Sequence, residues 1–131
     1  MAIYGIGAYF KIDVSDQFKE REIVGIGWDE NDAPDLHEYI KSLKVGDIIY
    51  IKSAPRSGGI TVKAIGIIID SEFVNNNLVL IGRNVKWISK DAFVLKPSEL
   101  NGKNNVRSNT IYEEFSPKVQ KRILKEFKLM S

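Results

Sequence analysis

The chain has 131 residues, 44% of them hydrophobic, which is enough for one core, and we expect residues 1–131 to form a single domain. It has no cysteine and only one histidine, His37, so a disulfide framework, a thiolate metal site and a histidine metal cluster are excluded. The formal net charge of +2 is too small to indicate by itself a protein that binds nucleic acid.

Two β-rich segments begin the chain. Residues 2–14 mix Ile, Tyr and Phe with two glycines, which predicts an early strand that permits a close backbone approach or a bulge. Residues 15–21 are polar and predict a turn or a single helical turn. A second strand is predicted over residues 22–28, and the turn-forming side chains of residues 29–32 end it.

A short amphipathic helix is predicted next, from Asp35 to about Lys44. Four apolar residues recur there at the spacing of one helix face: Leu36, Tyr39, Ile40 and Leu43. Asp32 is available as the cap of this helix, and the proline that follows is tolerated in its first turn.

A hairpin is predicted in the middle of the chain. Its strands cover residues 48–53 and 60–70, and the Gly-Gly pair before the second strand supplies the positive φ angles that a tight connection needs. In the second strand, the small residues Ala64 and Gly66 are expected to share a face with Val62 and Ile68. This arrangement leaves room for a bulky side chain to pack over them.

The rest of the chain is predicted as two strands, a loop and a helix. The strands cover residues 78–81 and 85–88, and the polar loop covers residues 97–109. The last element is a helix over residues 116–130, which starts with a serine cap and a proline suited to the first helical position.

The order of these elements predicts an α+β fold with about five to seven strands. The repeated alternation of strand and helix that a doubly wound parallel sheet requires is missing. We therefore expect a curved, mixed β-barrel with a short early helix and a C-terminal helix.

Charge is distributed unevenly along the chain. Residues 1–79 hold 8 Lys and Arg against 12 Asp and Glu, whereas residues 80–131 hold 11 against 5. If the basic half forms one face, that face would attract phosphate. The alternative is that these lysines and arginines only solvate the terminal helix.

The sequence gives no sign of a membrane protein. The N-terminal residues lack a cationic start before their apolar side chains, and no apolar run approaches the length of about 18 residues that a membrane span needs. We expect a soluble, unprocessed and cytoplasmic protein without a membrane partner, and the absence of cysteine is compatible with that compartment.

The two tryptophans and the cations near them are the candidate binding residues. Trp28 follows a strand and precedes an acidic turn, where a large ring commonly lies at a barrel mouth. Trp87 adjoins Lys86 and lies four residues after Arg83. Two aromatic walls with nearby cations would suit a base or nucleoside that carries phosphate. Either tryptophan can instead fill the core, so both interpretations stay open.

Other candidate sites are weaker. Arg56 and Ser57 lie in the hairpin loop, which could present a guanidinium and backbone N–H groups to phosphate, although a plain turn is the alternative. The glycine spacings of a phosphate-binding P-loop and of a dinucleotide-binding fold are absent. His37 is expected to be a solvated helix residue, and Asp47 a turn residue that caps the backbone, so the sequence predicts no catalytic site.

Four short segments resemble, in their order, the PUA-like superfamily, in particular its EVE-type and ASCH-type domains and the related modified-base reader modules of restriction systems. The segments are residues 26–28, 45–51, 64–68 and 85–88. The resemblance implies a curved β-barrel with a pocket that accepts a flipped or unpaired base, on which Trp28 or Trp87 would stack. The cations that it implies at the backbone phosphates are Lys52, Arg56, Arg83 and Lys86.

We therefore expect a nucleic-acid-binding module that recognises a modified or flipped base of DNA or RNA, without turnover and without a cofactor or metal. The first alternative is a barrel that binds a free nucleotide or nucleoside. It could also hydrolyse a modified nucleoside, as small ASCH-type amidohydrolases do, and this resemblance would give roles to Lys52 or Lys63 and to Glu30. A further alternative is an adaptor whose C-terminal helix docks a protein partner.

Overall fold

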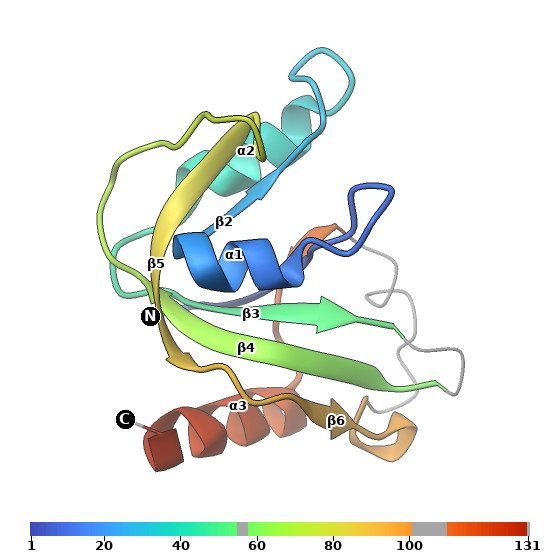
Figure 1. Cartoon of the computed structure of the whole chain (residues 1–131). Helices are drawn as coiled ribbons and strands as arrows, with labels where there is room; N and C mark the ends of the chain where they lie inside the picture. Colours follow the sequence, from blue (N-terminus) through green and yellow to red (C-terminus); the bar gives the residue numbers. More distant parts are fainter. Residues whose placement is uncertain (55–57, 101–109, 131) are drawn as a thin grey trace.

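The structure is a computed structural model that describes residues 1–54, 58–100 and 110–130 (Figure 1). Along these residues the elements are β1 (Ile3–Gly7), α1 (Ser15–Arg21), β2 (Ile23–Ile26), α2 (Pro34–Ser42), β3 (Ile48–Ser53), β4 (Ile60–Ile68), β5 (Ile81–Ser89), β6 (Phe93–Leu95), the short 3-10 helix η1 (Pro97–Leu100), β7 (Ile111–Glu113) and α3 (Pro117–Met130). Within the described ranges, no helix combines the length and the apolar character that crossing a membrane requires.

The strands form one strongly curled, mixed sheet in the order β2-β5-β4-β3-β1-β7, with β6 paired to β4. β1 runs parallel to β3, whereas the other neighbouring strands are antiparallel. β5 pairs with β2 through its first half and with β4 through its second half, so the sheet curls along this strand into a half-barrel. The prediction of an α+β fold with a curved mixed sheet and a C-terminal helix is confirmed.

Three local predictions are also confirmed. β3 and β4 form the expected antiparallel hairpin. α3 begins at Pro117, as the sequence indicates, but the predicted serine cap is wrong, because the buried Ser116 hydroxyl makes no hydrogen bond within the described part of the chain. Asp47 caps the backbone, because its carboxylate accepts hydrogen bonds from the N–H groups of Lys44 (2.8 Å) and Ala2 (3.1 Å).

Other boundaries differ from the expectation. Residues 15–21 form the complete helix α1 rather than a single turn. The predicted cap Asp32 is wrong, because α2 has Ala33 at its N-cap without a side-chain cap, and the Ala33 N–H instead donates to the carbonyl of Asp29 at 2.9 Å. Residues 81–89 form one long strand where two short strands were expected, and the short strands β6 and β7 were not predicted.

Both faces of the sheet are buried. One face packs against α1 and α2 in a cluster that includes Phe18 and Ile40. The other face packs against α3 through Val119 and Ile123. Figure 1 shows α1 and α3 on opposite sides of β3 and β4. Because neither face meets solvent over most of its area, strands such as residues 48–51 are continuous apolar runs without alternation.

Trp87 packs over a glycine of the neighbouring strand. A Cβ built at Gly66 would lie 2.8 Å from the Trp87 ring and 2.6 Å from the side chain of Val85. Gly66 and Trp87 are paired in the register of β4 and β5. The sequence-based prediction that a bulky group packs over Gly66 is therefore confirmed, and the group comes from the protein itself.

A bulge in β4 changes the direction of its side chains. Ile51 pairs with Ala64 but the next residue, Lys52, pairs with Val62, which leaves Lys63 as the extra residue. As a result Val62 packs in the α3 cluster while Ala64 packs in the opposite one. The expectation that Val62 and Ala64 share a face is wrong, because sequence periodicity does not reveal a bulge.

A buried polar network lies in the core under α3. The hydroxyl groups of Tyr50 and Tyr112 are 2.7 Å apart, and the Tyr50 hydroxyl donates to Glu114 Oε1 at 2.8 Å. The other carboxylate oxygen of Glu114 accepts the N–H of Ser116 at 3.1 Å, directly before α3. Gly5 of β1 faces the two rings, so the network joins three segments of the chain.

The close approach at Gly5 predicts a difference between two glycines of one strand. A Cβ at Gly5 would lie 2.7 Å from the Tyr112 ring and 2.8 Å from the Tyr50 ring, whereas the nearest atom to a Cβ at Gly7 lies at 3.8 Å. Gly5→Ala should therefore lower the free energy of unfolding by about 1 to 3 kcal/mol. Gly7→Ala should change it by less than about 0.5 kcal/mol. Denaturant titration measures both, and equal effects would contradict the packing described.

The same network predicts loss of stability at alkaline pH. Burial raises the pKa of Tyr112 from 10.0 to about 12, although its hydrogen bond with Tyr50 opposes the increase, and burial also raises the pKa of Tyr50. The folded protein thus keeps protons that the unfolded chain releases. The free energy of unfolding should therefore keep its full value below about pH 10. Above that pH it should fall by about 1.4 kcal/mol per pH unit for each of the two tyrosines.

Denaturant titrations between about pH 9 and 12, together with tyrosinate absorbance, measure this effect. The Tyr112→Phe variant removes one of the two groups and should lose stability less steeply than the unmodified chain. A decline of equal slope in both proteins would show that Tyr112 does not titrate as its burial requires.

Candidate functional site

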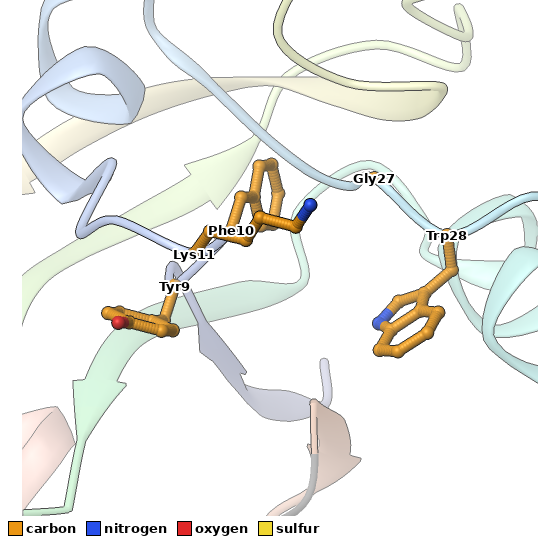
Figure 2. Close-up of a pocket in the computed structure, with 5 residues that line it drawn as sticks. All are labelled: Tyr9, Phe10, Lys11, Gly27 and Trp28. Atoms are coloured by element: carbon orange, nitrogen blue, oxygen red, sulfur yellow. The ribbon is translucent and has the colours of Figure 1, made fainter.

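Trp28 lies at the edge of a shallow hollow, which we call the aromatic groove. It is lined by Tyr9, Phe10, Lys11, Gly27 and Trp28 and has a volume of about 270 Å³. Figure 2 shows the Tyr9 and Trp28 side chains on either side of it, with Phe10 and Lys11 between them. The Tyr9 residue is 73% exposed and Trp28 is 55% exposed, so both rings are accessible to a ligand.

The first wall of the groove is a tight loop between β1 and α1. The N–H of Val14 donates to the carbonyl of Ala8 at 2.7 Å and closes the loop at its base. At its tip, the N–H of Phe10 donates to the carbonyl of Ile12 at 2.8 Å, and Lys11 has a left-handed backbone with φ of 68°. Because the loop is this short, its apolar side chains cannot all turn inward, and Tyr9 and Ile12 are exposed.

Phe10 joins the loop to the core. Its ring meets the ring of Phe18 edge to face at a centroid distance of 5.8 Å. A Cβ at Gly27 would lie 3.6 Å from the Phe10 ring, so this ring also rests against the segment that carries Trp28. Phe10 therefore separates the two walls of the groove.

An ion pair with β4 holds the same loop. The Lys63 ammonium donates to one carboxylate oxygen of Asp13, and the other oxygen accepts from the Ser15 hydroxyl (2.6 Å) and N–H (2.8 Å). Partial burial alone would raise the pKa of Asp13, but the hydrogen bonds with Lys63 and Ser15 hold it at about 2. The bulge in β4 places Lys63, its extra residue, at this contact.

The second wall is held by His37. This residue of α2 is buried, and its Nε2 lies 2.6 Å from the carbonyl oxygen of Trp28. Because a carbonyl can only accept, Nε2 carries the proton in this contact. The prediction that His37 is a solvated helix residue is wrong, since the segment after β2 folds back over α2 and covers the ring.

The groove can bind a flat ring and one negative group. Two exposed aromatic rings offer stacking surfaces, and Lys11 is the cation that lines the hollow. The turn after Trp28 carries carboxylates, including Asp29 and Glu30. The wall that carries Trp28 is therefore next to negative charge, whereas the loop between β1 and α1 contributes the positive charge of Lys11. Among the described residues, no group of three or more His, Asp or Glu side chains could hold a metal ion.

The structure separates the two tryptophans that the sequence singled out. Trp87 is 8% exposed, and its Nε1 donates to the carbonyl of Phe18 at 3.0 Å inside the core. It does not line the aromatic groove. Of the two interpretations left open by the sequence, the core applies to Trp87 and surface exposure applies to Trp28.

Arg83 is also an interior residue. Its guanidinium donates to the carbonyls of Ile40 (3.0 Å) and Leu43 through Nη1, and to that of Asp70 (2.7 Å) through Nη2. Burial lowers the pKa of Arg83, while Asp70 and Asp47 oppose this effect. Since Ile40 and Leu43 lie at the C-terminal end of α2, Arg83 satisfies carbonyls that the helix leaves open.

The other predicted cations lie apart from the groove or outside the described residues. Lys52 is buried, with its Nζ 5.6 Å from the centroid of the Tyr112 ring. Lys86 is exposed on β5 and does not line the groove. Arg56 and Ser57 lie outside the described residues.

Sequence reasoning missed Tyr9, Phe10 and Lys11. They were included in a strand predicted over residues 2–14, whereas β1 ends at Gly7. The available signal was the segment Asp-Val-Ser-Asp at residues 13–16, whose Asp and Ser side chains are typical of a helix start and imply a turn just before it. An aromatic pair placed in that turn would then have been predicted at the surface.

Comparison with known proteins gives a family but no activity. No curated protein matches the chain. The family described as a domain of unknown function (DUF8426) matches residues 11–114. The matched span begins at Lys11, contains Trp28 and ends before α3. Since this span covers well over half of the sequence, the chain belongs to the DUF8426 family.

Proposed function

We propose that this protein is a nucleic-acid-binding module that receives one unpaired or modified base in the aromatic groove. The observation that carries the proposal is the pair of exposed rings, Tyr9 and Trp28, on the two sides of a hollow of about 270 Å³ with Lys11 between them. A hollow of this size is close to the lower end of small-ligand pockets and suits one planar ring.

Stacking supplies the main attraction. A base that stacks on an aromatic side chain gains about 1 to 3 kcal/mol, which is comparable to the cost of taking a base out of a duplex. Both walls are held before a ligand arrives, one by the ion pair of Asp13 and Lys63 and the other by the His37–Trp28 contact. Binding therefore loses little conformational entropy in ordering the groove.

The charges around the groove favour one path for the phosphates. Lys11 lies in the loop that carries Tyr9, while the turn after Trp28 carries Asp29 and Glu30. Phosphate is attracted by the first group and repelled by the second. The sugar-phosphate backbone of the ligand should accordingly pass over the Tyr9 side, with the base pointing toward Trp28.

The curled mixed sheet with flanking helices supports a relationship to PUA-like barrels, which we include in the proposal. A cytoplasmic location is also part of the proposal, and the lack of cysteine is compatible with that compartment.

The proposed activity is binding without turnover. Lys52 and Lys63, the lysines considered for hydrolysis, do not line the groove.

A free nucleotide or nucleoside is the second candidate ligand. The specific observation in its favour is that one cation, Lys11, lines the groove, which is enough for a single phosphate but provides little attraction for a polymer. The two candidates differ in their length dependence, because affinity for a strand should rise with added nucleotides.

Substitution of either exposed ring should weaken binding of single-stranded oligonucleotides. Trp28→Ala and Tyr9→Ala each remove a stacking surface and should raise Kd by about tenfold or more, while Trp28→Phe should retain most of the affinity. Phe73→Ala is the matched control, since Phe73 is 54% exposed and does not line the groove.

Fluorescence titration at low salt, with modified and unmodified bases and with nucleoside monophosphates, measures these effects. If Trp28→Ala and Tyr9→Ala weaken the binding of monophosphates and of oligonucleotides of every length by the same factor, the second candidate is favoured. If neither ligand type binds, or if Phe73→Ala weakens binding as much as Trp28→Ala, the groove is not the site.

The anchor in β4 gives a further prediction. Lys63→Gln removes the ion pair with Asp13 and should loosen residues 9–13, which raises Kd several-fold because the loop must be ordered on binding. Lys41→Gln is the control, since it removes an ion pair with Glu38 on α2 that does not hold the groove. Hydrogen exchange should speed up at residues 9–13 in the first variant only. Unchanged exchange there would contradict the role given to Lys63.

A further inference from the structure

α3 carries a row of lysines on its exposed side, which we call the lysine row. Lys118, Lys121 and Lys125 follow one another at spacings of three and four residues and are all exposed. Residues at these spacings lie on one face of a helix. At a rise of about 1.5 Å per residue the three side chains cover about 10 Å of the surface, and exposed Lys128 lies on the same face.

The opposite face of α3 packs against the sheet. Val119 and Ile123 are buried in the α3 cluster, and Leu124 and Phe127 pack against it. The helix is thus fixed on the sheet with its lysines outward. From Pro117 to Lys128, the part of α3 whose side chains the structure describes, no second apolar face is left to insert into a bilayer, which a membrane-surface helix would need.

The carboxylates near the row are already paired with a different residue. Arg122 binds Glu126 of the same helix at 3.3 Å and Glu99 of η1 at 3.2 Å, and its guanidinium lies 4.7 Å from the Phe93 ring centroid. In the described part of the chain no ion pair involves Lys118, Lys121 or Lys125. The positive charge of the row is therefore not compensated by these acids.

We propose that the lysine row binds the phosphate backbone of a nucleic acid, without reading its sequence. Lysine contacts to phosphate need only charge and access, and release of counterions drives them. A protein partner is a poorer fit, because lysine is depleted at the centre of protein interfaces and this face offers no buried aromatic anchor. Figure 1 shows α3 on the opposite side of β3 and β4 from the loop between β1 and α1, which forms one wall of the aromatic groove, so the row is a second surface.

The test uses the full chain and a blunt DNA duplex of about 20 base pairs, which offers no unpaired base to the groove. The triple variant Lys118→Gln, Lys121→Gln, Lys125→Gln should bind at least about tenfold more weakly at low salt. The slope of log Kd against the logarithm of the salt concentration should be smaller by about 2 to 3, because each lost phosphate contact lowers this slope by about 0.9. If the triple variant is poorly folded, Lys121→Glu alone replaces it in the test, and this variant should also bind the duplex more weakly than the unmodified chain.

A second triple variant is the matched control. Lys19→Gln, Lys41→Gln, Lys44→Gln changes the net charge equally on the side of α1 and α2 and should leave the salt dependence close to that of the unmodified chain. Equal loss in both triple variants would overturn the proposal in favour of a general charge effect. Duplex binding that the α3 variants do not change, or tighter lysine-dependent binding to anionic vesicles than to duplex, would also overturn it.

The proposal does not depend on base binding in the groove. Trp28→Ala should leave duplex affinity and its salt dependence unchanged, because no base is available for stacking. Failure of the groove would appear only with single-stranded ligands, and failure of the lysine row only with the duplex.

Discussion

The structure depends on a sheet that must bury both of its faces. α1 and α2 cover one face and α3 covers the other, so a polar side chain inside the sheet needs a partner within the protein. Tyr50, Tyr112 and Glu114 meet this need by bonding to one another. The aromatic groove accordingly lies outside the buried faces, where the loops that leave β1 and β2 meet.

The same constraint explains why several polar and charged residues that look functional are structural. Arg83 binds the last carbonyls of α2, and His37 binds the carbonyl of Trp28. Lys63, turned outward by a bulge, holds the loop after β1. These residues do not touch a ligand in the proposed site, but two of them keep its walls in place. In the interior of this protein, such side chains connect separate backbone segments.

Sequence reasoning predicted the parts of the fold that depend on local chemistry. The proline at the start of α3, the capping role of Asp47 and the β3–β4 hairpin follow from residue types at single positions. It did not distinguish Trp28 from Trp87, because each belongs to or directly follows a β-rich segment, and the burial of Trp87 results from its pairing with Gly66 across two strands distant in sequence. Tyr9 was missed because residues 8–14 were assigned to a strand, whereas the hydrogen bond from the Val14 N–H to the Ala8 carbonyl closes them into a short loop.

The position of Phe10 has a consequence for the shape of the groove. Its ring meets Phe18 on one side and approaches the backbone of Gly27 on the other, so a change at either contact would move the loop relative to the segment that carries Trp28. A methyl group at position 27 would be in contact with that ring, and larger side chains would push the walls apart. The spacing of Tyr9 and Trp28 thus depends on a position that belongs to neither ring, and a substitution of Gly27 would reshape the hollow while both aromatic side chains stay the same.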